Sequence, residues 1–279
     1  MRTKETTRYL SLPYLAGVDL MRATFFTHSF SRHFHEDYAL GCIEHGAMRF
    51  RYRGSGLVAP AGHVNLVVPG EAHDGHAADA TGWTYSMFYL QPETVLAAAQ
   101  SLDPKAKLPH FRQGVINDPD LAARVKAAHS LLMDRDAPRL AKETRLLSLL
   151  RFWIRRYAED PGPAPKPPAQ EPDMVAKAKE YLAAHMQDDI SLDDLASVSA
   201  TSPFHLARAF TAQTGIPPHA FLVQLRLGRA KDLLGTPMRL ADIAAETGFS
   251  DQSHLTRRFK RQFGVTPGVM RKNIQNFSM

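Results

Sequence analysis

The chain has 279 residues, of which 44% are hydrophobic and 22% are charged, and its formal net charge is +6. This composition is typical of a folded chain with room for two domains, and it excludes a largely disordered protein. The single cysteine, Cys42, excludes an intrachain disulfide. The polar start lacks the apolar core of a signal peptide, and no run of roughly 20 apolar residues is present to span a membrane, so we expect a cytoplasmic protein.

Short β-like runs alternate with turn residues up to about residue 93. Examples are residues 47–52, 64–68 and 85–90, which are separated by glycine- and proline-containing turns. Many short strands joined in this way are typical of a small barrel or sandwich. The sequence therefore predicts a β-barrel over residues 1–110.

Three histidines are the strongest functional signal in this barrel. If His33 and His35 lie in one strand, their side chains point to the same face, and a later Pro-Gly-x-x-His motif ends in His73. Two imidazoles on one face and a third from a neighbouring strand can bind a metal ion. The two motifs resemble those of the cupin barrel, a fold that holds metals or small organic ligands.

The glutamate of metal-binding cupins, four or five residues after the second histidine, is replaced here by Ala39 and Leu40. We therefore favour a pocket in which the histidines contact an organic effector and no cofactor is needed. The alternative is a divalent metal held by all three imidazoles, as in a metal sensor or a metal-dependent cupin enzyme. We do not expect an enzyme, because no separate acid–base pair is evident.

Other side chains are candidates for the same effector pocket, namely Tyr38, Arg49 and Trp83. Alternation along a strand puts Arg49 and Arg51 on one face, where they can bind a carboxylate. The equally weighted alternative is two solvated arginines on the outside of the barrel.

Residues 111–159 predict a helical hairpin. Apolar residues recur at helical spacing from Leu121 to Leu132 and from Leu146 to Ile154, and prolines at 119 and 138 mark the two starts. The hairpin either covers the barrel or forms a dimerisation surface. Because the adjacent residues Phe152 and Trp153 cannot both face one core, dimerisation is mildly favoured. Residues 160–172 contain six prolines and predict an extended linker.

The remaining residues, 173–279, contain one pattern twice. Leu206, Phe210, Gly215 and Pro218 recur 49 residues later, as Leu255, Phe259, Gly264 and Pro267. Each copy consists of a short helix, a turn and a second helix with a polar outer side. This is a helix-turn-helix, and two in tandem predict an all-α domain that reads double-stranded DNA at two sites.

The outer sides of the two second helices carry residue types that suit DNA contacts. Glutamine pairs well with adenine and arginine with guanine, while lysine neutralises phosphate. Residues 250–279 hold six arginines and lysines against one acid, Asp251. The candidate DNA contacts are Phe204, His205, Ala207, Arg208, Gln252, Ser253, Thr256, Arg257 and Lys260.

Residues 173–272 closely resemble the AraC/XylS family of bacterial transcriptional regulators. One departure is Ala200, where the family usually has a turn glycine; we expect some strain there. The resemblance implies groove contacts by Phe204, Ala207 and Arg208 in the first unit. In the second unit it implies Gln252, Ser253, Thr256 and Arg257. The motifs that carry the resemblance lie at 191–196, 203–210, 214–218, 224–234, 243–249, 251–261 and 263–267.

Taken together, these features predict an α+β protein. A cupin-like effector barrel is followed by a helical hairpin, a linker and the tandem DNA reader. We expect a transcriptional activator that responds to a small molecule, acts with RNA polymerase and forms a homodimer through its front half. A third interpretation keeps the DNA reader but makes the barrel a dimerisation module only.

Overall fold

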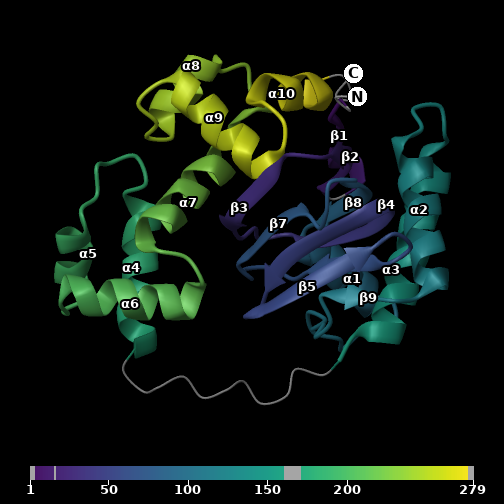
Figure 1. Cartoon of the computed structure of the whole chain (residues 1–279), viewed down its shortest axis with the longest axis horizontal. Helices are drawn as coiled ribbons and strands as arrows, with labels where there is room; N and C mark the ends of the chain where they lie inside the picture. Colours follow the sequence, from purple (N-terminus) through teal and green to yellow (C-terminus); the bar gives the residue numbers. More distant parts are fainter. Residues whose placement is uncertain (1–3, 16, 160–170, 276–279) are drawn as a thin grey trace. The chain divides into compact units, whose positions relative to one another are not determined.

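The computed structural model describes residues 4–15, 17–159 and 171–275. The chain forms two compact units, the first mainly residues 1–162 and the second mainly residues 163–275. Figure 1 labels their elements. The architecture is mixed α+β, with an antiparallel sheet and a helical hairpin in the first unit and only helices within residues 171–275.

The first unit is built on antiparallel strands in the order β1-β2-β8-β4-β6-β9, while β5 and β7 pair with β4, and β3 pairs with β7. The described strands are β1 (Thr6–Leu12), β2 (Val18–Phe25), β3 (Ser29–His33), β4 (Tyr38–Tyr52), β5 (Ser55–Pro60), β6 (Val64–Val67), β7 (His73–Ala77), β8 (Trp83–Leu90) and β9 (Val115–Ile116). A short helix, α1 (Pro92–Gln100), follows β8.

The long strand β4 belongs to two sheets. Its first half pairs with β6 and β8, and its second half pairs with β5 and β7. The register shifts between Ile43 and His45, and Gly46 follows with φ 67°. A Cβ on Gly46 would lie 2.0 Å from the Gly82 carbonyl oxygen, so only glycine fits where the strand changes partners.

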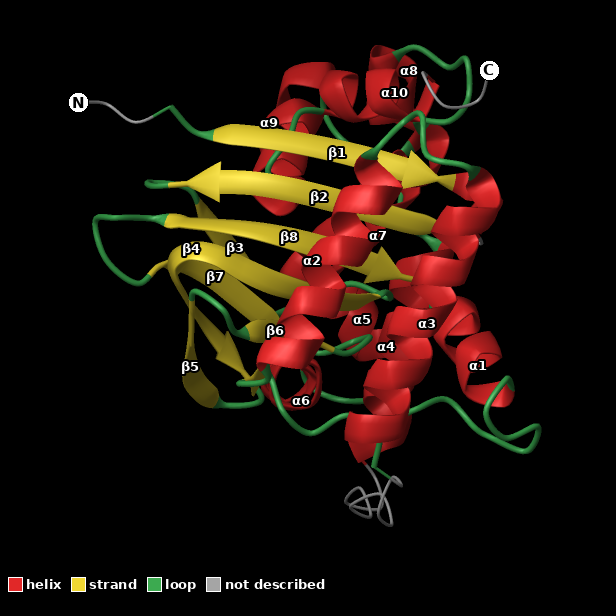
Figure 2. Ribbon diagram, turned by 90° about the vertical axis from the view of Figure 1, so that its right-hand side faces the viewer, coloured by secondary structure: helices red, strands yellow, loops and turns green. Residues whose placement is uncertain are grey.

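The two faces of the main sheet are both buried. One face carries Leu20, Leu40 and Phe88 and packs under helices α2 (Pro119–Met133) and α3 (Arg139–Tyr157), as Figure 2 shows. The opposite face, which we call the inner face, carries Met21 and Met87. Helices α2 and α3 therefore cover only one of the two buried faces.

The hairpin begins where the sequence predicts. Asp118 caps α2 by accepting hydrogen bonds from the backbone N–H groups of Asp120 and Leu121 at 2.9 and 3.2 Å. Its other oxygen accepts from the Tyr157 hydroxyl at 2.5 Å, which ties the start of α2 to the end of α3. Trp153 is fully buried in the core, so the hairpin covers the sheet.

Two predicted boundaries are corrected. Strand β9 pairs with β6 beyond residue 110, where the predicted barrel ends, because a two-residue strand carries no readable pattern. Helix α4 (Glu171–Ala184) begins inside the predicted linker, since Pro172 is tolerated in a first helical turn. The rest of that linker, residues 160–170, lies outside the described residues.

The second unit repeats one helix-turn-helix geometry. The recognition helices α6 and α9 each have 12 residues, and each ends at a left-handed glycine, Gly215 or Gly264. Leu206, Phe210, Leu255 and Phe259 anchor them at 0% exposure. Within the described residues this unit comprises α4, α5 (Leu192–Val198), α6 (Pro203–Thr214), α7 (Pro218–Leu233), α8 (Leu240–Glu246), α9 (Gln252–Phe263) and α10 (Pro267–Gln275).

Candidate functional site

Both recognition helices start from a side-chain cap of the same kind. The Ser202 hydroxyl accepts a hydrogen bond from the His205 backbone N–H at 3.3 Å, and the Asp251 carboxylate accepts one from His254 at 2.7 Å. The bond from the His254 backbone holds the pKa of Asp251 below its ordinary value. The caps fix the N-terminal ends of the helices, the ends that enter the groove in such motifs.

Helix α9 presents its predicted contacts outward. Gln252, Ser253, Arg257 and Lys260 are exposed, and Thr256 is half-buried. Neither Arg257 nor Lys260 forms an ion pair with a residue that the structure describes. Their charges are therefore available to a polyanion.

A second network on α9 keeps His254 neutral. Arg258 donates from Nε to His254 Nε2 at 3.3 Å, and the opposite ring nitrogen lies 3.1 Å from the Ser250 hydroxyl. Partial burial and the positive charges of Arg258 and Arg257 lower the pKa of His254. Because Nε2 must accept from Arg258, the ring serves to orient that guanidinium along the helix.

Helix α6 offers fewer polar groups. Arg208 is exposed, whereas His205 and Ala207 are half-buried. Phe204 lies in the first turn of α6, and its side chain is outside the described set. The first helix-turn-helix therefore presents a smaller polar surface than the second.

Arg226, on α7, links the segment after α4 to the turn of the second helix-turn-helix, and this role was not predicted from the sequence. Its guanidinium donates to the carbonyl oxygens of Met186 at 2.6 Å and Asp188 at 2.8 Å, just after α4. The guanidinium also packs against Gly248 in the turn of the second helix-turn-helix. Its partners are 38 and 40 residues away in the sequence, so no local spacing indicates this contact.

In the first unit, the structure brings two of the three predicted histidines together. The rings of His35 and His73 are 4.8 Å apart, edge to face, and His35 also lies 5.8 Å from the ring of Tyr89. His35 Nδ1 bonds the Asp37 carbonyl at 2.7 Å and His73 Nδ1 bonds the Glu71 carbonyl at 2.9 Å. Since a carbonyl only accepts, each Nδ1 carries a proton and donates it to its carbonyl.

His33 follows the same rule, with Nδ1 at 2.7 Å from the Ser31 carbonyl, and it is buried. Among the residues with a described position, however, no three His, Cys, Asp or Glu side chains are grouped so that they hold a metal ion. The donor set therefore does not fit the three-histidine metal site that the sequence offered as an alternative.

The other predicted pocket residues lie elsewhere. Tyr38 faces the helices, stacked edge-on to Phe111 and Trp153 with its hydroxyl on the Pro109 carbonyl at 2.7 Å. Tyr38 is thus a core residue, and its assignment to the pocket was wrong. Arg49 is exposed, as the solvated alternative required. Trp83 is on the inner face, but it is six residues along β8 from Tyr89, about 20 Å away.

The inner face carries polar groups that sequence reasoning missed. The Tyr9 hydroxyl donates a short hydrogen bond to buried Asp19, and Tyr85 and Tyr89 are hydrogen-bonded to each other. Burial raises the pKa of all three tyrosines, so their hydroxyls stay protonated. Hydroxyls and imidazoles gathered on one face suit a polar ligand group.

The fold and these surfaces define the class: a ligand-binding sheet domain joined to a tandem helix-turn-helix DNA-binding domain. Residues 15–150 match the AraC-like ligand binding domain, and residues 195–273 match a helix-turn-helix domain. An uncharacterized HTH-type transcriptional regulator, YbfI of Bacillus subtilis, is 32% identical over 89% of this chain and 90% of its own. The chain belongs to the AraC family of transcriptional regulators.

One further relative and one solved structure match most of the chain. The transcriptional activator RhaS of Escherichia coli is 24% identical over 89% of this chain and 90% of its own. The crystal structure of apo ToxT K231A from Vibrio cholerae superposes with a TM-score of 0.57 at 13% identity, covering 98% of each chain. That likeness shows a shared fold. In the described part of the chain, no helix is both long and apolar enough to cross a membrane.

Proposed function

We propose that the protein is a dimeric transcriptional activator whose small-molecule effector binds on the inner face of the sheet. The observation that carries the effector site is the pair His35–His73 beside Tyr89, with Tyr9 and Asp19 on the same face. These groups place hydroxyls, a carboxylate and imidazoles on one face, so we infer that the effector is a polar organic molecule.

On the DNA side, we infer that α9 reads bases with Gln252, Ser253, Thr256 and Arg257, while Lys260 contacts phosphate. Their exposure on one helix with capped N-terminus supports this assignment. Helix α6 adds Arg208, with His205, Ala207 and Phe204 near the same end of the helix.

An activator must also meet RNA polymerase, and the relative RhaS is an activator by name. A dimer contact through the hairpin is supported by Leu140 and Leu147 on α3, which are 73% and 41% exposed. Being seven residues apart, they lie on one side of the helix. A regulator that binds the chromosome of a bacterium works in the cytoplasm, which agrees with the predicted location.

The test uses the full-length protein and DNA obtained by selection from random duplexes. We expect a selected site that binds wild type tightly, a metabolite screen that yields a compound raising the melting temperature, and loss of that shift in His35→Ala. A compound that stabilises His35→Ala as well as wild type would place the effector elsewhere. Failure to select any DNA would remove the proposed regulatory function.

A further inference from the structure

A cavity lies on the side of the main sheet that faces α2, opposite the inner face. It has a volume of about 890 Å³ and is bounded by strands β1, β2, β4 and β8 on one side and by α2 on the other. Arg22 and Glu44 lie on its sheet wall, and His129 lies on its helix wall. The proposed effector site does not use any of these residues.

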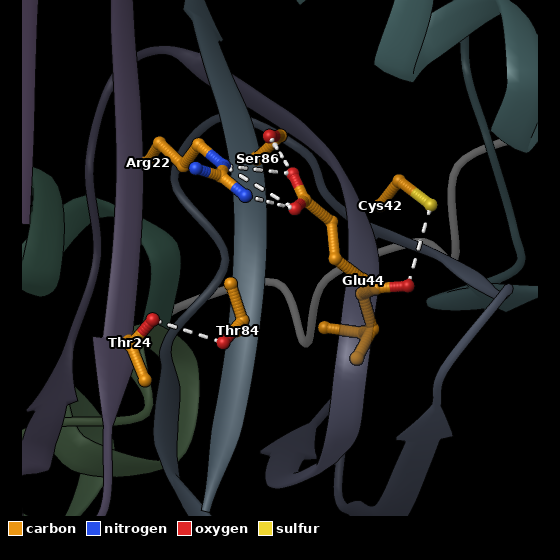
Figure 3. Close-up of polar contacts among 7 residues, drawn as sticks. Arg22, Thr24, Cys42, Glu44, Thr84 and Ser86 are labelled. Atoms are coloured by element: carbon orange, nitrogen blue, oxygen red, sulfur yellow. Dashed lines mark hydrogen bonds and ion pairs between the residues drawn. The ribbon is translucent and has the colours of Figure 1, made fainter. Parts of the chain in front are cut away.

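The sheet wall contains one neutralised ion pair (Figure 3). Arg22 donates to both carboxylate oxygens of Glu44, with its shortest contact at 2.7 Å, and the Ser86 hydroxyl donates to the same carboxylate. Burial raises the pKa of Glu44, but these hydrogen bonds outweigh it and keep the pKa below its ordinary value. Glu44 is therefore charged, and it balances Arg22.

Arg8 and Lys126 also line this cavity, and among the described residues neither has an acidic partner of the kind that Glu44 provides for Arg22. Arg8 stands directly opposite Arg22 in the β1–β2 register, an arrangement of like charges that destabilises a sheet. Neither Arg8 nor Lys126 forms an ion pair with any residue in the described ranges. An anion bound beside Arg8 and Lys126 supplies the negative charge that neither side chain has in an ion pair with a described residue.

The helix wall adds an unsatisfied buried polar atom. His129 is 2% exposed, and its ring hydrogen-bonds the Met21 backbone, but within the described structure its Nε2 has no partner. A buried nitrogen without a partner costs free energy whether it is a donor or an acceptor. A hydroxyl group can satisfy either state, because it both donates and accepts.

We propose that this cavity binds a hydroxylated organic anion, with its carboxylate or phosphate on Arg8 and Lys126 and a hydroxyl on His129. Asp134 and Asp136 line the same cavity, so they disfavour a ligand that is anionic at both ends. The ligand therefore has one anionic group and a hydroxylated body. Binding connects β1 to α2 and so ties the hairpin to the sheet.

The test is nuclear magnetic resonance of the full-length protein labelled with ¹⁵N in its histidine rings. His129→Gln identifies the His129 resonance by its loss. Gluconate presents a carboxylate and glucose 6-phosphate a phosphate, while acetate and glucose each present only half of the required chemistry. We expect gluconate or glucose 6-phosphate at millimolar concentration to move the His129 resonance, and the stronger of the two tells which anionic group is used.

Charge variants test the anion contact. Arg8→Gln and Lys126→Gln should weaken binding by roughly tenfold or more, the effect of losing one charge-assisted hydrogen bond. Arg151→Gln, an exposed arginine of α3 that does not line this cavity, should bind as wild type does. The proposal is overturned if neither probe moves the His129 resonance, if acetate and glucose act equally well, or if the probes move His35 and His73 instead.

Discussion

Replacing Gly248 by alanine should strongly destabilise the second helix-turn-helix, whereas replacing Ala200 by glycine should stabilise the first. The two residues occupy the same position in the two helix-turn-helix turns, 48 residues apart. Both are left-handed, with φ 52° at Ala200 and 72° at Gly248. The turn hydrogen bonds also match: Thr201 N–H donates to Ala196 O at 3.0 Å, and Phe249 N–H donates to Ala244 O at 2.8 Å.

The magnitudes follow from the surroundings of each Cβ. A left-handed backbone costs a residue with a Cβ about 1–2 kcal/mol, and a glycine gives back about 0.4–1 kcal/mol through the greater freedom of the unfolded chain. Ala200 is exposed, so Ala200→Gly should gain roughly 0.5–1 kcal/mol.

At Gly248 a Cβ would lie 2.9 Å from Arg226 Nε and 2.9 Å from the Met186 carbonyl oxygen. The guanidinium must then move away from a charge-assisted hydrogen bond worth about 1.5–3 kcal/mol. With the backbone strain, Gly248→Ala should cost roughly 2–4 kcal/mol.

The assay is hydrogen exchange of the full-length protein by mass spectrometry, with urea unfolding followed by circular dichroism. In Gly248→Ala, peptides of α8 and α9 should exchange faster, while those of the first unit's sheet should not change. In Ala200→Gly, peptides of α5 and α6 should exchange more slowly. The reasoning is refuted if Gly248→Ala leaves exchange in α8 and α9 unchanged, or if Ala200→Gly speeds exchange in α5 and α6.

Three further predictions concern other parts of the chain. Arg257→Ala should weaken binding to a selected site by about 1–3 kcal/mol and relax base choice at one position. Lys260→Ala should weaken binding to all sequences alike and lower the slope of log affinity against log salt concentration by about one, as titrations at several salt concentrations will show. Equal loss of specificity in both variants contradicts this assignment. His73→Ala should abolish the effector response and leave DNA binding intact in a mobility-shift assay; a normal response removes His73 from the pocket. Burial lowers the pKa of His129 to about 4, so between pH 6.5 and 4 the unfolded chain binds a proton that the folded chain does not. The free energy of unfolding should therefore fall by up to about 3 kcal/mol from pH 6.5 to 4. His129→Gln should reduce this pH dependence, and an equally steep dependence in the variant would assign it to other groups.

Local rules account for what the sequence predicted well. Ala200 is left-handed, as its place in the turn required. Such features depend on neighbours within a few residues. The 49-residue repeat likewise locates both recognition helices without knowledge of the fold.

Features that depend on distant parts of the chain were not predictable in this way. The first six residues of β4 are all buried, so no alternation indicates which face Tyr38 takes. That face follows only from the pairing of β4 with β6 and β8. Arg226 and the Tyr9–Asp19 pair show the same limit, since their partners are set by tertiary packing and leave no trace in local spacing.

The most direct test of the two-unit DNA reader is a hydroxyl-radical footprint of the full-length protein on a selected site. We predict two protected segments on one face of the duplex, about 34 Å apart, the spacing of successive major-groove sites. Arg208→Ala should weaken protection of one segment and Arg257→Ala that of the other. A single protected segment, or loss of the same segment in both variants, would contradict the claim that each helix-turn-helix unit reads its own site.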